Sequence, residues 1–213
     1  MSQGGLHTNA VVQDWPSFRS AVMVIDRSLH DEDVENMKFL CQGLLVCSEL
    51  SRKDTAPEII TLLQRANLVT EEDYFLLADL LLYIGRVDVL ENIGYDTAKV
   101  ILQRHQQSSK IKPFFVLLFN LAEELTDKDV EKASAIYYGR IKRSRLQKLS
   151  SGLELFMTMM HQWDIRPEDV TCLITIFSLL QRQDLVEKIN GYTGKGRNNF
   201  FLTVHLTSGF LGG

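Results

Sequence analysis

The chain has 213 residues, of which 45% are apolar and 23% charged, a composition typical of globular proteins and unlike disordered or collagen-like ones. No apolar run approaches the roughly 18 residues of a membrane span, and the first residues lack the basic start and apolar core of a secretory signal. The cysteines (Cys41, Cys47 and Cys172) show no metal-ligand spacing and suit a reducing compartment. We therefore expect a helical, cytoplasmic protein that does not bind membranes.

Helical spacing of apolar residues predicts six short helices in the first half of the chain. Asp14, placed before Trp15-Pro16, is a predicted N-cap with a proline in the first turn. The acids at 31–33 would meet the positive end of the second helix dipole. In chain order, the predicted helices begin near Asp14, Asp31, Glu49, Pro57, Thr70 and Arg86.

The second half of the chain repeats the first at a constant offset of 96 residues. This repeat predicts an all-α fold of two tandem six-helix bundles, with domains at 14–96 and 112–192, a polar linker around 96–112 and a tail at 193–213. Because bundles of roughly 80 residues are only marginally stable alone, we expect the two to pack together. Matching positions include Phe18 with Phe114, Asp33-Val34-Glu35 with Asp129-Val130-Glu131, Gly43 with Gly139, and Arg86 with Arg182.

The charges are divided unequally between the two halves. Residues 1–96 contain 7 Lys and Arg against 16 Asp and Glu, a net charge of −9, and residues 97–213 contain 16 against 11, a net charge of +5. Such a chain can dock its acidic half on the basic half of itself or of a neighbour, head to tail. Alternatively, the difference reflects solvated helix faces alone.

An arginine stands two residues before an acid at the same repeat position in both halves. Side chains at that spacing do not face each other on a helix, so each arginine is expected to reach another helix, where an acid at the start of the second helix is also repeated. A guanidinium can bridge two carboxylates with its planar fork. Such networks either fix helix packing alone or also orient a partner surface. The predicted networks are Asp33–Arg86–Asp88 and Asp129–Arg182–Asp184.

The second predicted helix carries more apolar residues than one face can bury. Phe39 and Leu40 on it are either core residues or an exposed patch for another domain. At the matching positions the second half has Ala135 and Ile136, so a patch there would be weaker.

No pattern in the sequence indicates an enzyme, a metal site or a cofactor site. The five histidines are scattered, and no glycine-rich phosphate loop follows a strand. The run from Gly139 to Lys148 has five basic residues in ten, which suits a solvated loop or contact with an acidic protein face. Because the whole chain is weakly acidic, nucleic-acid binding is not expected.

The segment 33–41, the Arg-x-Asp motifs at 86–88 and 182–184, and the segment 151–156 together resemble the tandem death effector domain family over about 14–192. This resemblance implies death-fold bundles, self-association, and homotypic binding to the death effector domain of the Fas-associated adaptor and to initiator caspase prodomains. The chain ends at Gly213 without a QACxG-type protease motif, as in the FLICE-like inhibitory proteins of short cellular or viral form. It is therefore expected to block caspase activation. The alternative is the prodomain part of an initiator caspase, which promotes filament assembly.

The resemblance also bears on Phe39 and on the tail. In such tandem proteins the Phe-Leu surface of the first domain usually packs on the second domain, which implies a rigid joint at Phe39 and not a free patch. The Ala135-Ile136 departure puts chain growth through the second domain in doubt. The tail after Gly191 is expected either to be isoform-specific without a fold of its own or to supply a pairing strand.

Overall fold

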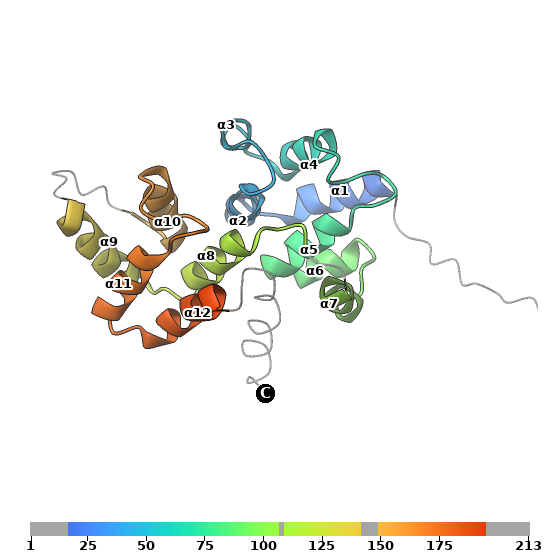
Figure 1. Ribbon diagram of the computed structural model, residues 1–213. Coiled ribbons are helices and arrows are strands. Elements are labelled where there is room, and N and C mark those ends of the chain that lie inside the picture. Colours follow the sequence, from blue (N-terminus) through green and yellow to red (C-terminus); the bar gives the residue numbers. More distant parts are fainter. Residues whose placement is uncertain (1–16, 107–108, 142–148, 195–213) are drawn as a thin grey trace, which may run out of the picture.

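The computed structural model describes residues 17–106, 109–141 and 149–194, and it shows two helical bundles lying next to each other (Figure 1). The predicted all-α fold of two tandem, packed bundles is confirmed. Within the described ranges there is no strand, only an isolated β-bridge between Arg166 and Asp169. None of the helices in those ranges is both long and apolar enough to cross a membrane.

The first bundle contains α1 to α7 and the second contains α8 to α12. The helices of the first bundle are α1 (Phe18–Ser28), α2 (Asp31–Cys41), α3 (Cys47–Leu50), α4 (Ala56–Arg65), α5 (Phe75–Tyr83), α6 (Val87–Asn92) and α7 (Thr97–Gln106). Those of the second are α8 (Pro113–Glu123), α9 (Asp127–Ile141), α10 (Gly152–His161), α11 (Thr171–Leu179) and α12 (Gln183–Gly194). A counterpart of α3 would fall at residues 142–148, outside the described ranges.

Several helices begin with a side-chain cap, at the point where polar residues give way to apolar residues at helical spacing. The Ser17 hydroxyl accepts from the Ser20 amide at the start of α1, whereas the predicted cap Asp14 lies outside the described residues. At the start of α2, the Asp33 carboxylate accepts from the His30 amide at 2.9 Å. Such caps satisfy amides that have no partner within the helix.

The repeat extends to backbone conformation. Asn67 and Trp163, 96 residues apart, both follow a helix with positive φ, of 54° and 63°. Gly85 and Gln181, separated by the same offset, have φ of 75° and 61°. Because the left-handed conformation favours glycine and asparagine, the first bundle fills these positions with less strain than the second.

Replacing Trp163 with glycine should raise the free energy of unfolding by about 1 kcal/mol, because glycine adopts the left-handed backbone conformation with less strain than tryptophan. Trp163 is 77% exposed, so its side chain has little contact to lose. Urea unfolding followed by circular dichroism measures the change. Asn67→Gly is the matched control and should be nearly neutral, since asparagine tolerates this conformation. A loss of stability in Trp163→Gly would show that the indole makes stabilising contacts.

The stretch 96–112, predicted as a polar linker between the domains, contains the helix α7. This helix packs against α5 and α6. Arg104 of α7 is only 5% exposed and pairs with Asp79 of α5, which is 1% exposed. The connection between the bundles is therefore anchored to the first bundle by a buried ion pair.

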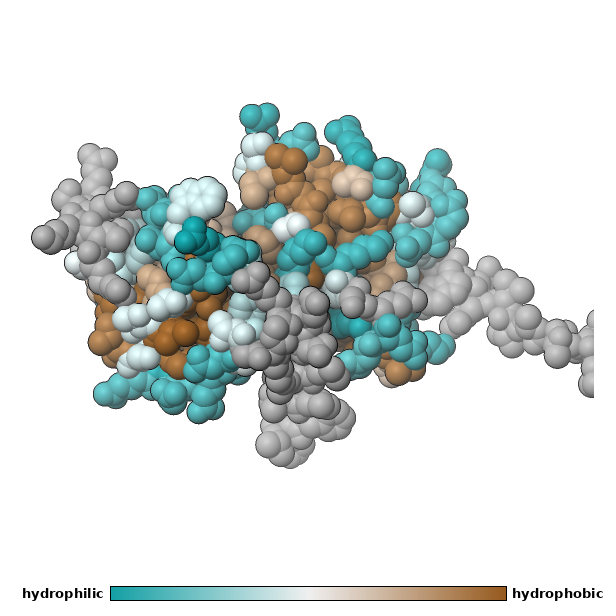
Figure 2. All heavy atoms as spheres, viewed as in Figure 1, coloured by the Kyte–Doolittle hydropathy of each residue, from teal (hydrophilic) through white to brown (hydrophobic). Residues whose placement is uncertain are grey.

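The two bundles meet where α2 packs on α8. The Phe39 and Phe115 rings meet edge to face with centroids 5.9 Å apart. A Cβ added at Gly43 would lie 2.7 Å from the Phe115 ring, whereas one at Gly139 would meet nothing within 4 Å. The first bundle therefore uses a face for this contact that the second bundle leaves open. In Figure 2, hydrophilic residues cover the middle of the visible face, with apolar areas over α4 and α11.

Candidate functional site

The Arg86 guanidinium joins three elements of the first bundle. It donates to Asp33 of α2 at 2.5 Å from Nη1 and to Asp88 of α6 at 2.9 Å from Nε and 2.8 Å from Nη2. Nη1 also donates to the Ser28 carbonyl, at the end of α1, at 2.8 Å. The structure thus brings together the three side chains of the first predicted network.

The second bundle repeats this arrangement around Arg182. Its Nη1 donates to Asp129 at 2.7 Å, and its Nη2 donates to Asp184 at 2.6 Å. The Glu124 carbonyl accepts from both terminal nitrogens at 3.2 Å. The Lys188 ammonium pairs with the Glu124 carboxylate, an addition that the first bundle does not share, because Asn92 stands at its repeat position.

Two acceptors in these networks were missed by sequence reasoning. The carbonyls of Ser28 and Glu124 stand 96 residues apart, each at the end of the first helix of its bundle, where carbonyls lack intrahelical partners. Their only sequence signal is this position. The guanidinium therefore ties α1, α2 and α6 in the first bundle and α8, α9 and α12 in the second.

The inner acid of each network also caps its helix. Asp33 accepts from the His30 amide, and Asp129 accepts from the Thr126 amide and hydroxyl. A carboxylate at this end is further favoured by the helix dipole. This double use explains why the acid must stand at the third helical position in both bundles.

The networks have a sheltered inner part and an exposed outer acid. The side chains of Arg86 and Asp33 are 19% and 15% exposed, while that of Asp88 is 61% exposed. In the second bundle the Asp184 side chain is 52% exposed. Each bundle therefore presents a carboxylate to solvent, held in place by an arginine.

Charge pairing holds the outer carboxylates ionised. Hydrogen bonds from Arg86 lower the pKa of Asp88 to about 2, and hydrogen bonds from Arg182 lower the pKa of Asp184. For Asp129, burial raises the pKa but the hydrogen bonds from Thr126 and the charge of Arg182 outweigh it, so the net pKa is lowered. Asp88, Asp129 and Asp184 are therefore charged at neutral pH, which keeps both networks ionic.

The helix-two positions do not form an exposed apolar patch on the first bundle. Phe39 and Leu40 are 2% and 0% exposed, and Phe39 lies in the contact with the second bundle. The exposed-patch interpretation is therefore wrong for these two residues. At the matching positions of α9, Ala135 is exposed and Ile136 is half-buried.

The remaining candidates from the sequence do not add a chemical centre. No group of His, Cys, Asp and Glu side chains suited to a metal ion occurs among the residues that the structure describes. Burial raises the pKa of the Cys41 thiol to about 12, so this cysteine is a protonated core residue. The basic run that begins at Gly139 lies outside the described residues from residue 142 to residue 148.

Comparison with known proteins places this geometry in a family. The profile of the family described as "Death effector domain" matches residues 18–97 and 114–195. Human caspase-10 is 29% identical over 160 residues, covering 74% of this chain and 29% of the caspase. The human FAS-associated death domain protein is 28% identical over 80 residues, covering 38% of each chain.

A solved structure has the same fold. The crystal structure of the viral FLIP MC159 matches with a TM-score of 0.70 at 17% identity, covering 84% of this chain and 97% of that one. The chain spans only about a third of the length of the curated relatives it matches. With two matched segments that together cover most of its residues, the chain belongs to the death effector domain family and carries two tandem copies of the domain.

Proposed function

We propose that this protein is a non-enzymatic, cytoplasmic regulator of death-receptor apoptosis. It binds the death effector domain of the Fas-associated adaptor and the prodomains of initiator caspases, and it blocks caspase activation. The observation that carries the proposal is the presence in both bundles of the same guanidinium network with an outward carboxylate, at Asp88 and Asp184.

The two networks suit homotypic binding because they are preorganised. An arginine held by an inner acid and by the carbonyl at the end of a helix loses little conformational freedom when a partner approaches. The contribution of such a partly exposed network to stability is small, so its main effect would be on the orientation of a partner. Complementary charges of this kind favour specificity and rapid association.

Differences between the bundles support inhibition over assembly. Phe39 of the first bundle packs on Phe115 of the second bundle and is therefore not available to a partner. The second bundle has the smaller Ala135 at the matching position. A protein that joins a filament through one bundle, but offers only a weak apolar contact on its other bundle, would extend the filament poorly. The same charges would also allow this protein to self-associate.

The alternative function is that of an initiator caspase prodomain, which promotes filament assembly. It is favoured by the similarity to human caspase-10, of which this chain covers 29%. Reconstituted filament growth of a caspase prodomain distinguishes the two functions. Slower growth in the presence of this protein supports inhibition, and faster growth supports assembly.

Reversing the charge of Arg86 or Arg182 to glutamate should weaken binding to the adaptor's death effector domain by about tenfold or more, while helix content stays near normal. Co-precipitation and circular dichroism measure the two effects. Arg65→Glu, which alters an exposed arginine at the end of α4, is the matched control and should bind normally.

A milder variant separates binding from folding. Asp88→Asn with Asp184→Asn removes only the exposed carboxylates and leaves both inner pairs, Arg86–Asp33 and Arg182–Asp129, in place. It should fold like the unaltered protein and bind the adaptor more weakly. Normal adaptor binding by the variant with both arginines reversed would refute the proposed role of the networks.

A further inference from the structure

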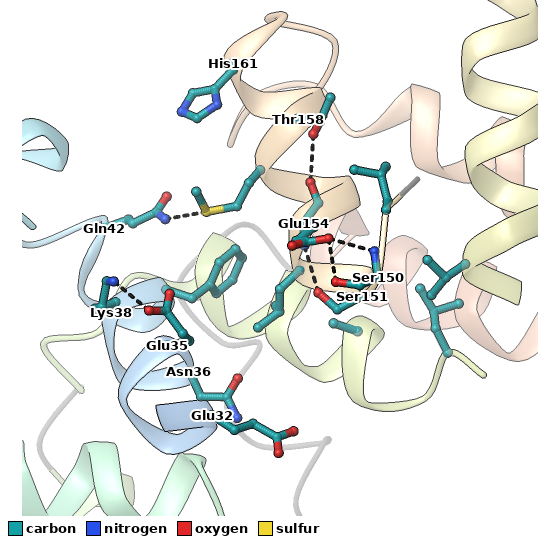
Figure 3. A pocket seen from close by; sticks show the side chains of 18 of the residues that line it. Glu32, Glu35, Asn36, Lys38, Gln42, Ser150, Ser151, Glu154, Thr158 and His161 are labelled. Atoms are coloured by element: carbon teal, nitrogen blue, oxygen red, sulfur yellow. Dashed lines mark hydrogen bonds and ion pairs between the residues drawn. The ribbon is translucent and has the colours of Figure 1, made fainter. Parts of the chain in front are cut away.

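A groove of about 1170 Å³ runs between the two bundles, and its lining includes no side chain of either guanidinium network. One wall comes from α2 and α3, and the other from the end of α8, the start of α9 and α10 (Figure 3). The Gln42 amide donates to the Met157 sulfur at 2.7 Å and joins the walls. The groove is larger than the roughly 300–1,000 Å³ of a small-molecule pocket, which favours a polypeptide segment as its occupant.

Part of the lining of the groove, called its floor below, is apolar. Phe39, Leu125, Leu153 and Met157 line it, and all but Phe39 are partly accessible. This combination of apolar floor and open length is typical of grooves that receive one face of an amphipathic helix.

The rim of the groove is strongly acidic. Five carboxylates line it, those of Glu32, Glu35, Glu123, Asp127 and Glu154, against one ammonium and one imidazole, those of Lys38 and His161. The ammonium is already paired with Glu35 at 2.7 Å, as the close view shows (Figure 3). The rim therefore repels phosphates and anionic lipids and attracts cations.

Two of these acids, Glu32 and Glu123, lie close enough across the contact between the bundles for their charges to interact. Burial and the charge of Glu32 together raise the pKa of Glu123. No lysine or arginine in the described parts of the chain forms an ion pair with either carboxylate. Glu32 belongs to α2 and Glu123 to α8, so the repulsion exists only because the bundles are packed together.

We infer that the groove between the bundles is a docking site for a basic amphipathic segment of a partner protein, with lysines or arginines on the acidic rim and an apolar face on the floor. Charge complementarity selects this occupant, since the rim has a surplus of carboxylates. The inference is independent of the proposed function, because it uses none of the residues of the guanidinium networks.

The test uses the full chain and a synthetic peptide of ~14 residues made of lysine, leucine and alanine with one apolar helical face. An environment-sensitive fluorophore on Cys47, an exposed residue of the groove wall, reports local occupancy. Cys172 is replaced by serine to direct the label. The peptide should change the fluorescence, and its affinity should fall as salt is raised.

Glu32→Gln with Glu123→Gln should weaken peptide binding about fivefold or more, as expected for the loss of two charge contacts. Glu71→Gln with Glu72→Gln is the matched control, because it removes the same charge from exposed acids outside the groove. It should bind the peptide normally, and thermal melts should show both variants folded.

Three results would overturn the inference. The first is an absence of binding at low salt, and the second is equal weakening in the control variant, which would indicate general charge attraction. The third is self-association that the Glu32 and Glu123 variant abolishes, without peptide binding, which would assign the groove to a second copy of this chain. None of these results would affect the proposed role of Arg86 and Arg182, which is tested with the adaptor domain.

Discussion

Replacing Arg104 with leucine should lower the free energy of unfolding of the first bundle by about 3–5 kcal/mol. The change would leave the Asp79 carboxylate, which is 1% exposed, without its countercharge. Urea unfolding followed by circular dichroism measures the loss, and hydrogen exchange of α7 amides should increase, because Arg104 is the buried polar anchor of this helix.

The expected size follows from the surroundings of the pair. Arg104 Nε donates to Asp79 Oδ1 at 2.5 Å, and Nη2 donates to the Asp79 carbonyl at 3.1 Å. The guanidinium carbon lies 3.9 Å from the centre of the Tyr83 ring, a cation–π contact. The Ser109 hydroxyl donates to the other carboxylate oxygen at 2.5 Å. Removing the arginine therefore breaks several contacts at once and leaves a buried charge.

A double variant distinguishes the pair's net contribution from the penalty of an unpaired charge. Asp79→Leu with Arg104→Met should recover most of the stability lost by either single change, because a buried ion pair is often replaceable by well-packed apolar side chains. If Arg104→Leu alone lowered the free energy of unfolding by less than about 1 kcal/mol, as for a surface pair, the prediction that Arg104 anchors α7 would be wrong.

The charge networks could be predicted because the repeat marked their members. Arg86 and Arg182 occur at the same repeat position as each other, as do Asp33 and Asp129. Each arginine also contacts the acid two residues further on, because the arginine precedes the first residue of its helix, whereas side chains at this spacing inside a helix do not face each other. The carbonyls of Ser28 and Glu124 could not be predicted in this way, since every residue carries the same backbone acceptor.

The linker and the groove show where the sequence pattern is uninformative. The only buried residues of α7 are Val100 and Arg104. Because an arginine in a sequence gives no sign that it is buried, the apolar pattern of this segment is too weak to predict a packed helix. The groove depends on how two bundles are oriented, which involves residues distant in the chain. Differences between the repeats do carry a signal, however. Gly43 lies against Phe115, whereas its counterpart Gly139 faces open space.

Replacing Phe39 with alanine should lower the free energy of unfolding by about 3–5 kcal/mol and loosen the contact between the bundles. Phe39 is 2% exposed, and its ring packs edge to face on Phe115 of the second bundle with centroids 5.9 Å apart. The loss should therefore divide between the core of the first bundle and the joint. Urea unfolding measures the stability, and small-angle X-ray scattering measures the spread of the two bundles.

Phe156→Ala is the matched control, because Phe156 is fully buried and packs on Phe177 within the second bundle, with ring centroids 6.4 Å apart. It should destabilise its own bundle by a similar amount without increasing the radius of gyration of the folded protein, whereas Phe39→Ala should increase it. Equal scattering from the two variants under native conditions would mean that other contacts hold the bundles together.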